Sequence, residues 1–293
     1  MSSYVPLCLR VLHPWFVRVG HPMRSLPFIF LFFTSLPYYF FTSFPVTIPP
    51  MPSPVAFIIP TLNEQATIGT VLDALHAVLP AAGLSQAEFL VVDNNSTDAT
   101  ARIATGRGAR VINEPRRGYG QACLSGIAAL STEAQIIVFL DADGSDDPRD
   151  LPRLLAPLFD GSSDFVLGSR TIAARLSSAF TPPQAFGNWL ATSLMRLFFG
   201  ARYSDLGPFR AICRQSLDRL RMSDINYGWT IEMQIKAHRL GLRVLEIPVN
   251  YRKRLAGQSK ISGNLLGSIR AGYKILWSIA KYALSPQKIK RQI

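Results

Sequence analysis

The sequence of 293 residues has only three cysteines, Cys8, Cys123 and Cys213, and only four histidines. The cysteines lie far apart, with no CxxC pair and no cysteine–histidine cluster, which excludes a disulfide framework and a zinc site. Charged residues make up only 17% of the chain and hydrophobic residues 48%. This composition excludes a disordered or collagenous chain, and it is too polar for a polytopic membrane protein.

Acidic residues are absent from both ends of the chain. Residues 1–50 contain three arginines and no acid, a net charge of +3, and residues 247–293 contain ten basic residues and no acid, a net charge of +10. Residues 51–246 hold 18 basic and all 19 acidic residues and are nearly neutral, so the overall charge of +12 lies at the ends. Because a nucleic-acid-binding domain normally carries its basic surface on the fold itself, we do not expect a nucleic acid as partner.

The first fifty residues form a hydrophobic leader. No charge occurs between Arg24 and Glu64, and eight of the eighteen phenylalanines precede residue 50. The run is long enough to span a bilayer, and the arginines before it fit a membrane anchor. Prolines interrupt the run and no A-x-A-like site follows it, which argues against a secretory signal peptide. The other interpretation is a spurious upstream extension, with Met51 as the true start.

From residue 55 onward, short apolar runs alternate with helical patterns. The runs predict strands at residues 55–59, 89–92, 109–113, 135–140 and 164–169. Strands that are apolar along their whole length are buried on both faces, so the alternation predicts an α/β fold with a parallel sheet covered on both faces. We expect this domain to occupy residues 51–250, followed by a basic loop and an amphipathic helix in residues 251–293.

Acidic residues follow three of the predicted strands. Glu64 follows the first strand, Asp93 the second, and Asp141 and Asp143 the fourth. Each of them alone could be a turn or helix-cap residue. Ligands of such open sheets bind beyond the carboxyl ends of the strands, where these carboxylates would share one cleft. The Asp141–Asp143 pair can hold a hard divalent cation, Mg²⁺ or Mn²⁺, whose shell is often completed by phosphate oxygens.

Eight segments resemble glycosyltransferase family 2, which has the GT-A fold, and more closely its polyprenyl-phosphate sugar synthases of the dolichol-phosphate mannose synthase type. They fall in the family's order over roughly residues 55–262: PTLNE, VVDNNSTD, RRGYGQA, FLDADGSDDP, VLGSR, DLGPFRA, YGWTIEMQIKAHRLG and EIPVNYRKRLAGQSKISG. The resemblance implies a Rossmann-like, mostly parallel sheet. It also implies inverting, metal-dependent transfer of a sugar from a GDP- or UDP-hexose to a polyprenyl phosphate.

The resemblance also implies roles for individual residues. Those implied to bind the nucleotide are Pro60, Thr61, Glu64, Asp93 and Gly118. Those implied in catalysis at the metal and diphosphate are Asp141, Asp143 and Arg170. Those implied to bind the phosphate or acceptor are Arg210, Arg252, Arg254 and Lys260. Guanidinium groups suit phosphates because they bind them bidentately, although an ordinary ion pair is the alternative for each arginine.

The nature of the acceptor decides whether a general base is needed. A sugar hydroxyl needs a carboxylate to take its proton, and Glu232 stands at an acceptor-side position of the family. A polyprenyl phosphate is already anionic and needs positive charge instead. Asn94 and Ser145 depart from the family pattern, and the second departure leaves the metal shell to Asp146 or water. A membrane-surface scaffold without turnover therefore remains an alternative.

The C-terminal stretch predicts an amphipathic helix. At about 100° per residue, Arg270, Lys274 and Lys281 form a basic stripe opposite a broad apolar face that includes Tyr273 and Trp277. Such a helix lies on an anionic membrane surface, while packing against the catalytic domain or self-association are the alternatives. We expect the protein to be membrane-associated, with its active site facing the cytoplasm.

Overall fold

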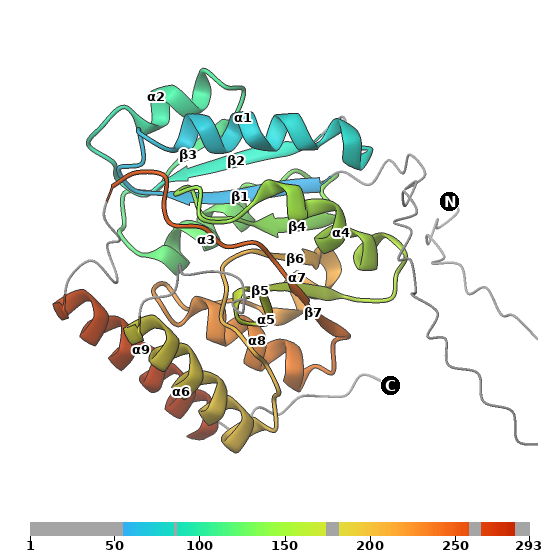
Figure 1. Cartoon of the computed structure of the whole chain (residues 1–293), viewed down its shortest axis with the longest axis vertical. Helices are drawn as coiled ribbons and strands as arrows, with labels where there is room; N and C mark the ends of the chain where they lie inside the picture. The colour runs from blue at the N-terminus through green and yellow to red at the C-terminus, as the bar shows by residue number, and fades with distance from the viewer. Residues whose placement is uncertain (1–54, 85–86, 174–181, 258–264, 285–293) are drawn as a thin grey trace, which may run out of the picture. The chain divides into compact units, whose positions relative to one another are not determined.

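A mixed sheet of seven strands forms the centre of the described part of the chain (Figure 1). The structure, a computed structural model, describes residues 55–84, 87–173, 182–257 and 265–284. The strands are β1 (Val55–Thr61), β2 (Glu88–Asp93), β3 (Arg110–Asn113), β4 (Ile136–Phe139), β5 (Phe165–Ser169), β6 (Arg210–Cys213) and β7 (Val244–Pro248). Their order across the sheet is β3-β2-β1-β4-β6-β5-β7. Strand β6 runs antiparallel to its neighbours β4 and β5, and all other pairs are parallel.

The five predicted strands are confirmed as β1 to β5, and the prediction of a mostly parallel α/β sheet is confirmed with them. The last two strands were not expected from the sequence. Strand β6 has only four residues and begins with Arg210, and β7 is an edge strand that is partly exposed along its length. Neither strand therefore shows the long apolar run that marks a buried parallel strand.

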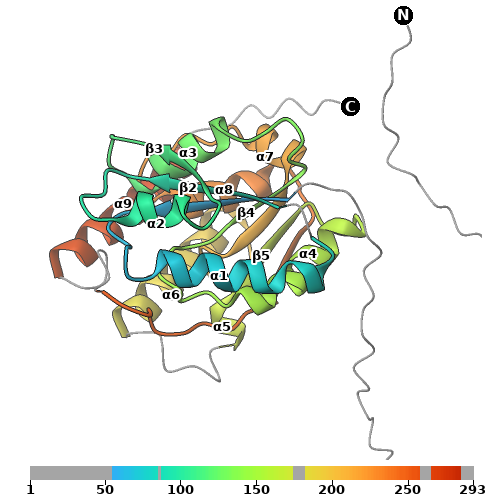
Figure 2. The same ribbon diagram turned by 90° about the horizontal axis from the view of Figure 1, so that it is seen from above.

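Helices cover both faces of the sheet. They are α1 (Ile68–Val78), α2 (Thr100–Thr105), α3 (Tyr119–Ala128), α4 (Leu151–Phe159), α5 (Arg170–Ala173), α6 (Pro182–Phe199), α7 (Arg214–Leu220), α8 (Trp229–Arg239) and α9 (Leu265–Leu284). Helices α1, α2 and α4 pack on one face, and α3, α7 and α8 pack on the other. Figure 2 shows α1 and α4 on one side of the strands and α3, α7 and α8 on the other.

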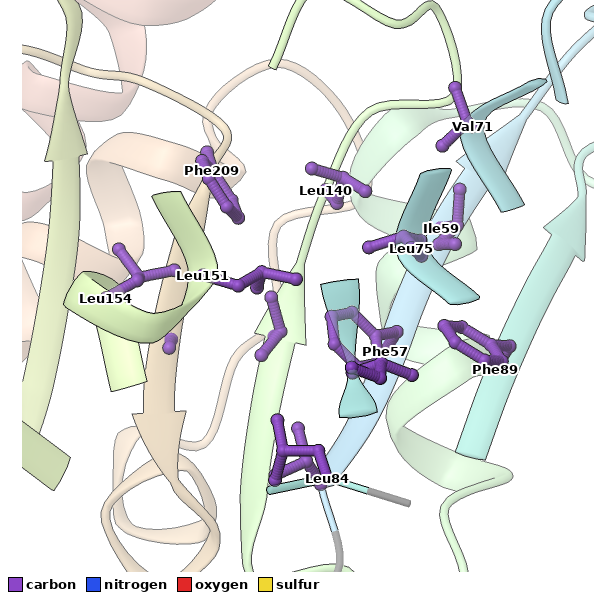
Figure 3. Close-up of a cluster of buried hydrophobic side chains, with 14 of the residues drawn as sticks. Phe57, Ile59, Val71, Leu75, Leu84, Phe89, Leu140, Leu151, Leu154 and Phe209 are labelled. Carbon is purple, nitrogen blue, oxygen red and sulfur yellow. The ribbon is translucent and has the colours of Figure 1, made fainter. Parts of the chain in front are cut away.

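Strand β1 shows why both faces are apolar. Successive side chains of a strand point to opposite faces, so Phe57 and Ile59 enter the cluster under α1 while Ile58 enters the cluster under α3. In the first cluster the Phe57 ring stacks on Phe89 of β2, with ring centroids 5.1 Å apart (Figure 3). Leu75 of α1 is fully buried in the same cluster. This packing fixes the positions of β1 and β2, and acidic residues follow the ends of both strands.

The predicted C-terminal helix is present as α9, which lies beside α6 (Figure 1). Ile279 and Tyr282 on its inner face are buried against α6 and α8, while Tyr273 and Trp277 are exposed. One face of this helix therefore packs against the rest of the domain, as one of the sequence-based alternatives predicted. Within the described ranges, no helix is both long enough and apolar enough to cross a bilayer. The predicted leader, residues 1–50, lies outside the described residues.

Candidate active site

The carboxyl ends of β1, β2 and β4 lie side by side and bring the predicted nucleotide-binding residues together. Thr61 at the end of β1 pairs in register with Asp93 at the end of β2. The Thr61 hydroxyl donates to the carbonyl of Val92 (3.1 Å), and the backbone N–H of Glu64 donates to the hydroxyl of Thr100 (2.8 Å). The first bond joins the ends of β1 and β2, and the second fixes the loop after β1 against the start of α2. Pro60, the residue before Thr61, lies within β1.

Asp141, Asp143 and Asp146 follow β4 in one tight loop. Asp143 accepts from the backbone N–H of Ser145 (2.9 Å), and a left-handed glycine, Gly144 at φ 72°, allows the turn. Burial, together with the charge of Asp143, raises the pKa of Asp141 to about 7. Burial and both neighbouring carboxylates raise the pKa of Asp146 as well. The loop therefore concentrates negative charge where water solvates it poorly.

A divalent cation fits this loop. One oxygen of Asp146, Oδ1, is buried and has no hydrogen-bond partner among the described residues. Buried polar atoms normally have a partner, and a bound cation would supply one here. Within the described part of the chain, no three metal-binding side chains gather into a complete site. Asp141 and Asp143 would hold the cation, with its other ligands supplied by diphosphate oxygens and water.

A segment after β7 lies across these carboxylates, and we call residues 250–257 the basic strap (Figure 1). Its backbone is tied to the loop after β4, because the N–H of Arg252 donates to Ser145 O (2.9 Å) and that of Leu255 to Asp143 O (3.1 Å). Arg254 bridges two loops: its Nη2 lies 2.6 Å from Glu64 Oε1 and its Nη1 lies 3.1 Å from Asp143 Oδ2. The strap thus brings a positive charge to the residues expected to meet the donor.

The other strap arginine and Arg170 border the same site. Arg252 pairs with the buried Asp147 at 2.9 Å. Arg170, just after β5, binds Asp205 through both its backbone N–H (2.8 Å) and its Nε (2.9 Å), and its guanidinium lies 4.9 Å from the centre of the Tyr251 ring. Asp205 thereby fixes Arg170 beside the start of the strap. Lys260, another predicted phosphate-binding residue, lies outside the described residues.

The structure does not place Arg210 at the cleft, contrary to the prediction from the GPFRA segment. The side chain is fully buried, and its guanidinium donates to the carbonyls of Gly207 and Thr230. Burial lowers the pKa of Arg210 to about 10. It binds backbone carbonyls between β6 and α8 instead of a phosphate. Its position on β6, which was not expected from the sequence, explains the error.

Glu232 is likewise buried and away from solvent, contrary to its predicted place on the acceptor side. Its carboxylate accepts from Lys236 Nζ (2.6 Å), the Tyr282 hydroxyl (2.6 Å), the Ser223 hydroxyl (2.7 Å) and the N–H of Asp224 (2.7 Å). Burial alone would raise the pKa of Glu232. The hydrogen bonds outweigh that effect, so the pKa is lowered. Glu232 therefore anchors α9 and the 223–224 turn to α8, and it is not a free base.

Tyr119 is a site residue that the sequence did not reveal. It begins α3, and its hydroxyl donates to Asp141 Oδ1 at 3.1 Å, which orients the carboxylate and favours its charged form. The glycine before it, Gly118, donates its N–H to Asn94 Oδ1 at 2.8 Å, and a side chain there would overlap the carbonyl of Ile225. Tight packing thus explains why a glycine occupies position 118. The only sequence signal for Tyr119 was its position next to this glycine.

The family departure at Asn94 has a structural reason. The amide nitrogen of Asn94 donates to the carbonyls of Glu114 (3.1 Å) and Arg116 (2.7 Å), while its oxygen accepts from Gly118. An aspartate could not donate these two bonds. Asn94 therefore ties the loop after β2 to the loops around α3.

Residues 56–221, more than half of the chain, match the family model described as glycosyl transferase family 2. The chain belongs to glycosyltransferase family 2. Membership makes this protein a glycosyltransferase. The resemblance drawn from eight sequence segments is confirmed.

Curated relatives of this glycosyltransferase extend over most of its length. An uncharacterized glycosyltransferase of Mycobacterium tuberculosis is 39% identical over 74% of this chain and 94% of its own length. The undecaprenyl-phosphate mannosyltransferase of Micrococcus luteus is 30% identical over 73% of this chain and 89% of its own. The polyprenol monophosphomannose synthase of Mycolicibacterium smegmatis is 29% identical over 71% of this chain and 80% of its own.

A solved structure shares the fold. Glucosyl-3-phosphoglycerate synthase from Mycobacterium tuberculosis, in complex with Mn²⁺, UDP-glucose and phosphoglyceric acid, superposes on the glycosyltransferase with a TM-score of 0.61 at 25% identity. The similarity covers 80% of this chain and 81% of the other. The predicted GT-A fold class is thereby confirmed.

We expect Mn²⁺ binding by this glycosyltransferase to weaken as the pH falls through about 7, the pKa of Asp141. A cation needs the ionised carboxylate, and below its pKa each pH unit removes about tenfold of that form. Titration of the donor-free protein with Mn²⁺ at pH 6 and pH 8, by calorimetry or electron paramagnetic resonance, measures the effect. Equal affinities at the two pH values would contradict it.

Arg254→Met should strengthen Mn²⁺ binding to the donor-free protein by about threefold or more, because the guanidinium and the cation compete for Asp143. The same titration measures the change. Arg252→Met is the matched control, since Arg252 pairs with Asp147. Unchanged or weaker binding in Arg254→Met would show that the guanidinium does not compete.

Glu232→Gln should destabilise the fold by about 3–5 kcal/mol, because it breaks a buried ion pair with Lys236. Chemical denaturation measures the loss, and Glu133→Gln, an exposed change, is the control. Turnover per folded molecule should stay within a few-fold of the original. A stable variant without turnover would instead identify Glu232 as the base.

Proposed function

We propose that this glycosyltransferase moves a sugar from a nucleotide sugar to a polyprenyl phosphate, with inversion, at the cytoplasmic face of a membrane. The observation that carries the proposal is the basic strap, which sets Arg252 and Arg254 beside the acidic loop after β4. An anionic acceptor needs positive charge there and has no proton to give up. The predicted base for a hydroxyl acceptor, Glu232, is buried in bonds to its neighbours.

The relatives support the same substrate classes. The Micrococcus and Mycolicibacterium proteins are named for transfer to undecaprenyl phosphate and for synthesis of polyprenol monophosphomannose. The solved synthase binds Mn²⁺ and UDP-glucose together. For this chain we propose a GDP- or UDP-hexose donor and Mg²⁺ or Mn²⁺ as the cation.

The residues divide the work as follows. Thr61 and Asp93, which end β1 and β2, and Glu64, which lies three residues after β1, would border the nucleoside. A cation held by Asp141 and Asp143 would neutralise the charge that grows on the departing diphosphate. A phosphate oxygen of the acceptor attacks the anomeric carbon from the opposite side, and the bond from that carbon to the diphosphate oxygen breaks with its electron pair. Because the attacking oxygen carries no proton, no base is involved.

Arg254 serves both substrates in this scheme. Its two nitrogens now bind Glu64 and Asp143, and when the donor complex takes over these carboxylates the guanidinium becomes available to an acceptor phosphate. The C-terminal basic residues, including Lys274 and Lys281 on α9, support a place at an anionic membrane surface.

A second candidate is transfer to a hydroxyl of a small phosphorylated acid. The solved synthase favours it, since that protein is bound to phosphoglyceric acid. The strap would hold the phosphate of such an acceptor equally well. The two candidates differ in whether the product dissolves in organic solvent or in water.

Asp143→Ala should lower sugar transfer by at least roughly a hundredfold, because the cation that would neutralise the departing diphosphate loses a ligand. The assay supplies radiolabelled GDP-mannose or UDP-glucose, Mn²⁺ and a short-chain polyprenyl phosphate, and counts label in the organic phase. Asp218→Ala, an exposed change on α7, is the control. Label that enters only a water-soluble product from phosphoglyceric acid would overturn the lipid acceptor, and full activity in Asp143→Ala would overturn the site.

A further inference from the structure

Large apolar side chains are exposed mainly on two neighbouring helices. Of eleven large hydrophobic residues exposed in the described part of the chain, eight lie on α6 and α9. They are Phe186, Trp189, Leu197 and Phe198 on α6, and Tyr273, Leu276, Trp277 and Leu284 on α9. Trp189 is 60% exposed and Trp277 56%, which is unusual for the largest apolar side chain. Such a concentration marks an interaction surface.

The exposed sides of the two helices point the same way. On their inner sides, Met195 of α6 and Ile279 of α9 meet Ile235 of α8 in one buried cluster. Both helices therefore turn their outer sides away from α8. Figure 1 and Figure 2 show α6 and α9 at the same end of the fold.

Helical spacing places all of these residues except Phe198 in one stripe on each helix. At about 100° per residue, Phe186, Trp189 and Leu197 fall within roughly 80° of each other. Tyr273 and Trp277 fall within roughly 40° of each other. The Phe186 and Trp189 rings also contact each other, with centroids 5.8 Å apart. We call the seven residues of the two stripes the two-helix face.

All charged residues of α6 and α9 are positive. Neither residues 182–199 nor residues 265–284 contain an aspartate or glutamate. Arg196 on α6 and Lys274 and Lys281 on α9 are exposed beside the aromatic side chains. Two copies of this face would repel each other, whereas an anionic surface complements it. Aromatic rings with an apolar body and a polar edge, flanked by lysine and arginine, suit the headgroup region of a bilayer.

We propose that the two-helix face docks on an anionic lipid bilayer, and that α6 supplies half of the contact through Phe186 and Trp189. This inference deepens the proposed function, on which it rests for the presence of a membrane. Only seven residues, 258–264, separate the basic strap from α9, and they span at most about 25 Å. The strap that would bind a lipid phosphate is therefore tethered close to the docking face.

Tryptophan quenching tests the contact on the full chain, bound to vesicles of phosphatidylcholine and brominated phosphatidylglycerol. Trp189→Phe and Trp277→Phe should each lose the part of the quenched emission that the substituted tryptophan contributes. The contribution of any other membrane-bound segment cancels in the comparison with the original protein. Trp229 is buried and does not contribute. Unchanged quenching in Trp189→Phe would overturn the role of α6.

Vesicle flotation supplies the second measurement. Combined Phe186→Ser and Trp189→Ser changes should weaken binding to anionic vesicles by roughly tenfold, because two exposed rings lose their apolar burial. Ile225→Ser with Leu245→Ser is the matched control, since both residues are exposed outside the two-helix face. Equal loss in both pairs, or a change of oligomeric state by light scattering in the α6 pair alone, would overturn the proposal.

Activity separates this inference from the proposed function. The α6 pair should keep transfer to a short-chain polyprenyl phosphate dissolved in detergent, because the substituted residues lie outside the acidic loops and the strap. Normal vesicle docking without lipid-linked product would contradict the proposed acceptor and leave the docking face standing. Lipid-linked product with unaltered docking in the α6 pair would contradict the docking face alone.

Discussion

The carboxylates after β4 are the constraint on which the arrangement depends. Asp141, Asp143 and Asp146 sit where burial raises the pKa of the first and third, and an uncompensated cluster of this kind would be costly. The fold offsets it with Tyr119 from the start of α3 and Arg254 from the strap. The start of α3 and the strap, which are far apart in the chain, thus both contact the carboxylates of this loop at one edge of the sheet.

Sheet order explains how these segments meet. The antiparallel β6 separates β4 from β5, yet β5 and β7 run in the same direction as β1 and β4. Their carboxyl ends, with Arg170 and the strap, consequently face the same edge as the acidic loop. One edge of one sheet therefore carries both the acidic loops and the arginines that pair with them, and the carboxyl ends of the strands are where open α/β sheets bind ligands.

The acidic loops can be located from the sequence because an apolar strand followed by aspartates is a local pattern. The same holds for the strap, whose arginines stand out in a stretch without acids. The predicted positions of Arg210 and Glu232 at the cleft were wrong, because the sequence of a family segment does not show whether a charged side chain is buried. Their positions depend on backbone carbonyls and on Tyr282, which the sequence places 50 residues beyond Glu232. Helix α6 gave no signal because it is apolar on its inner and outer sides alike, so it shows no single stripe.

The double pairing of Arg254 has a consequence for how substrates arrive. The Arg254 guanidinium is shared between Glu64 and Asp143. A nucleoside diphosphate sugar without a metal ion would therefore be repelled by these carboxylates, and the guanidinium that could bind its phosphates would already be paired. A diphosphate that carries its own cation presents positive charge to the same oxygens. Under the proposed function, this pairing would favour entry of the donor as a preformed metal chelate and departure of the nucleoside diphosphate in the same form.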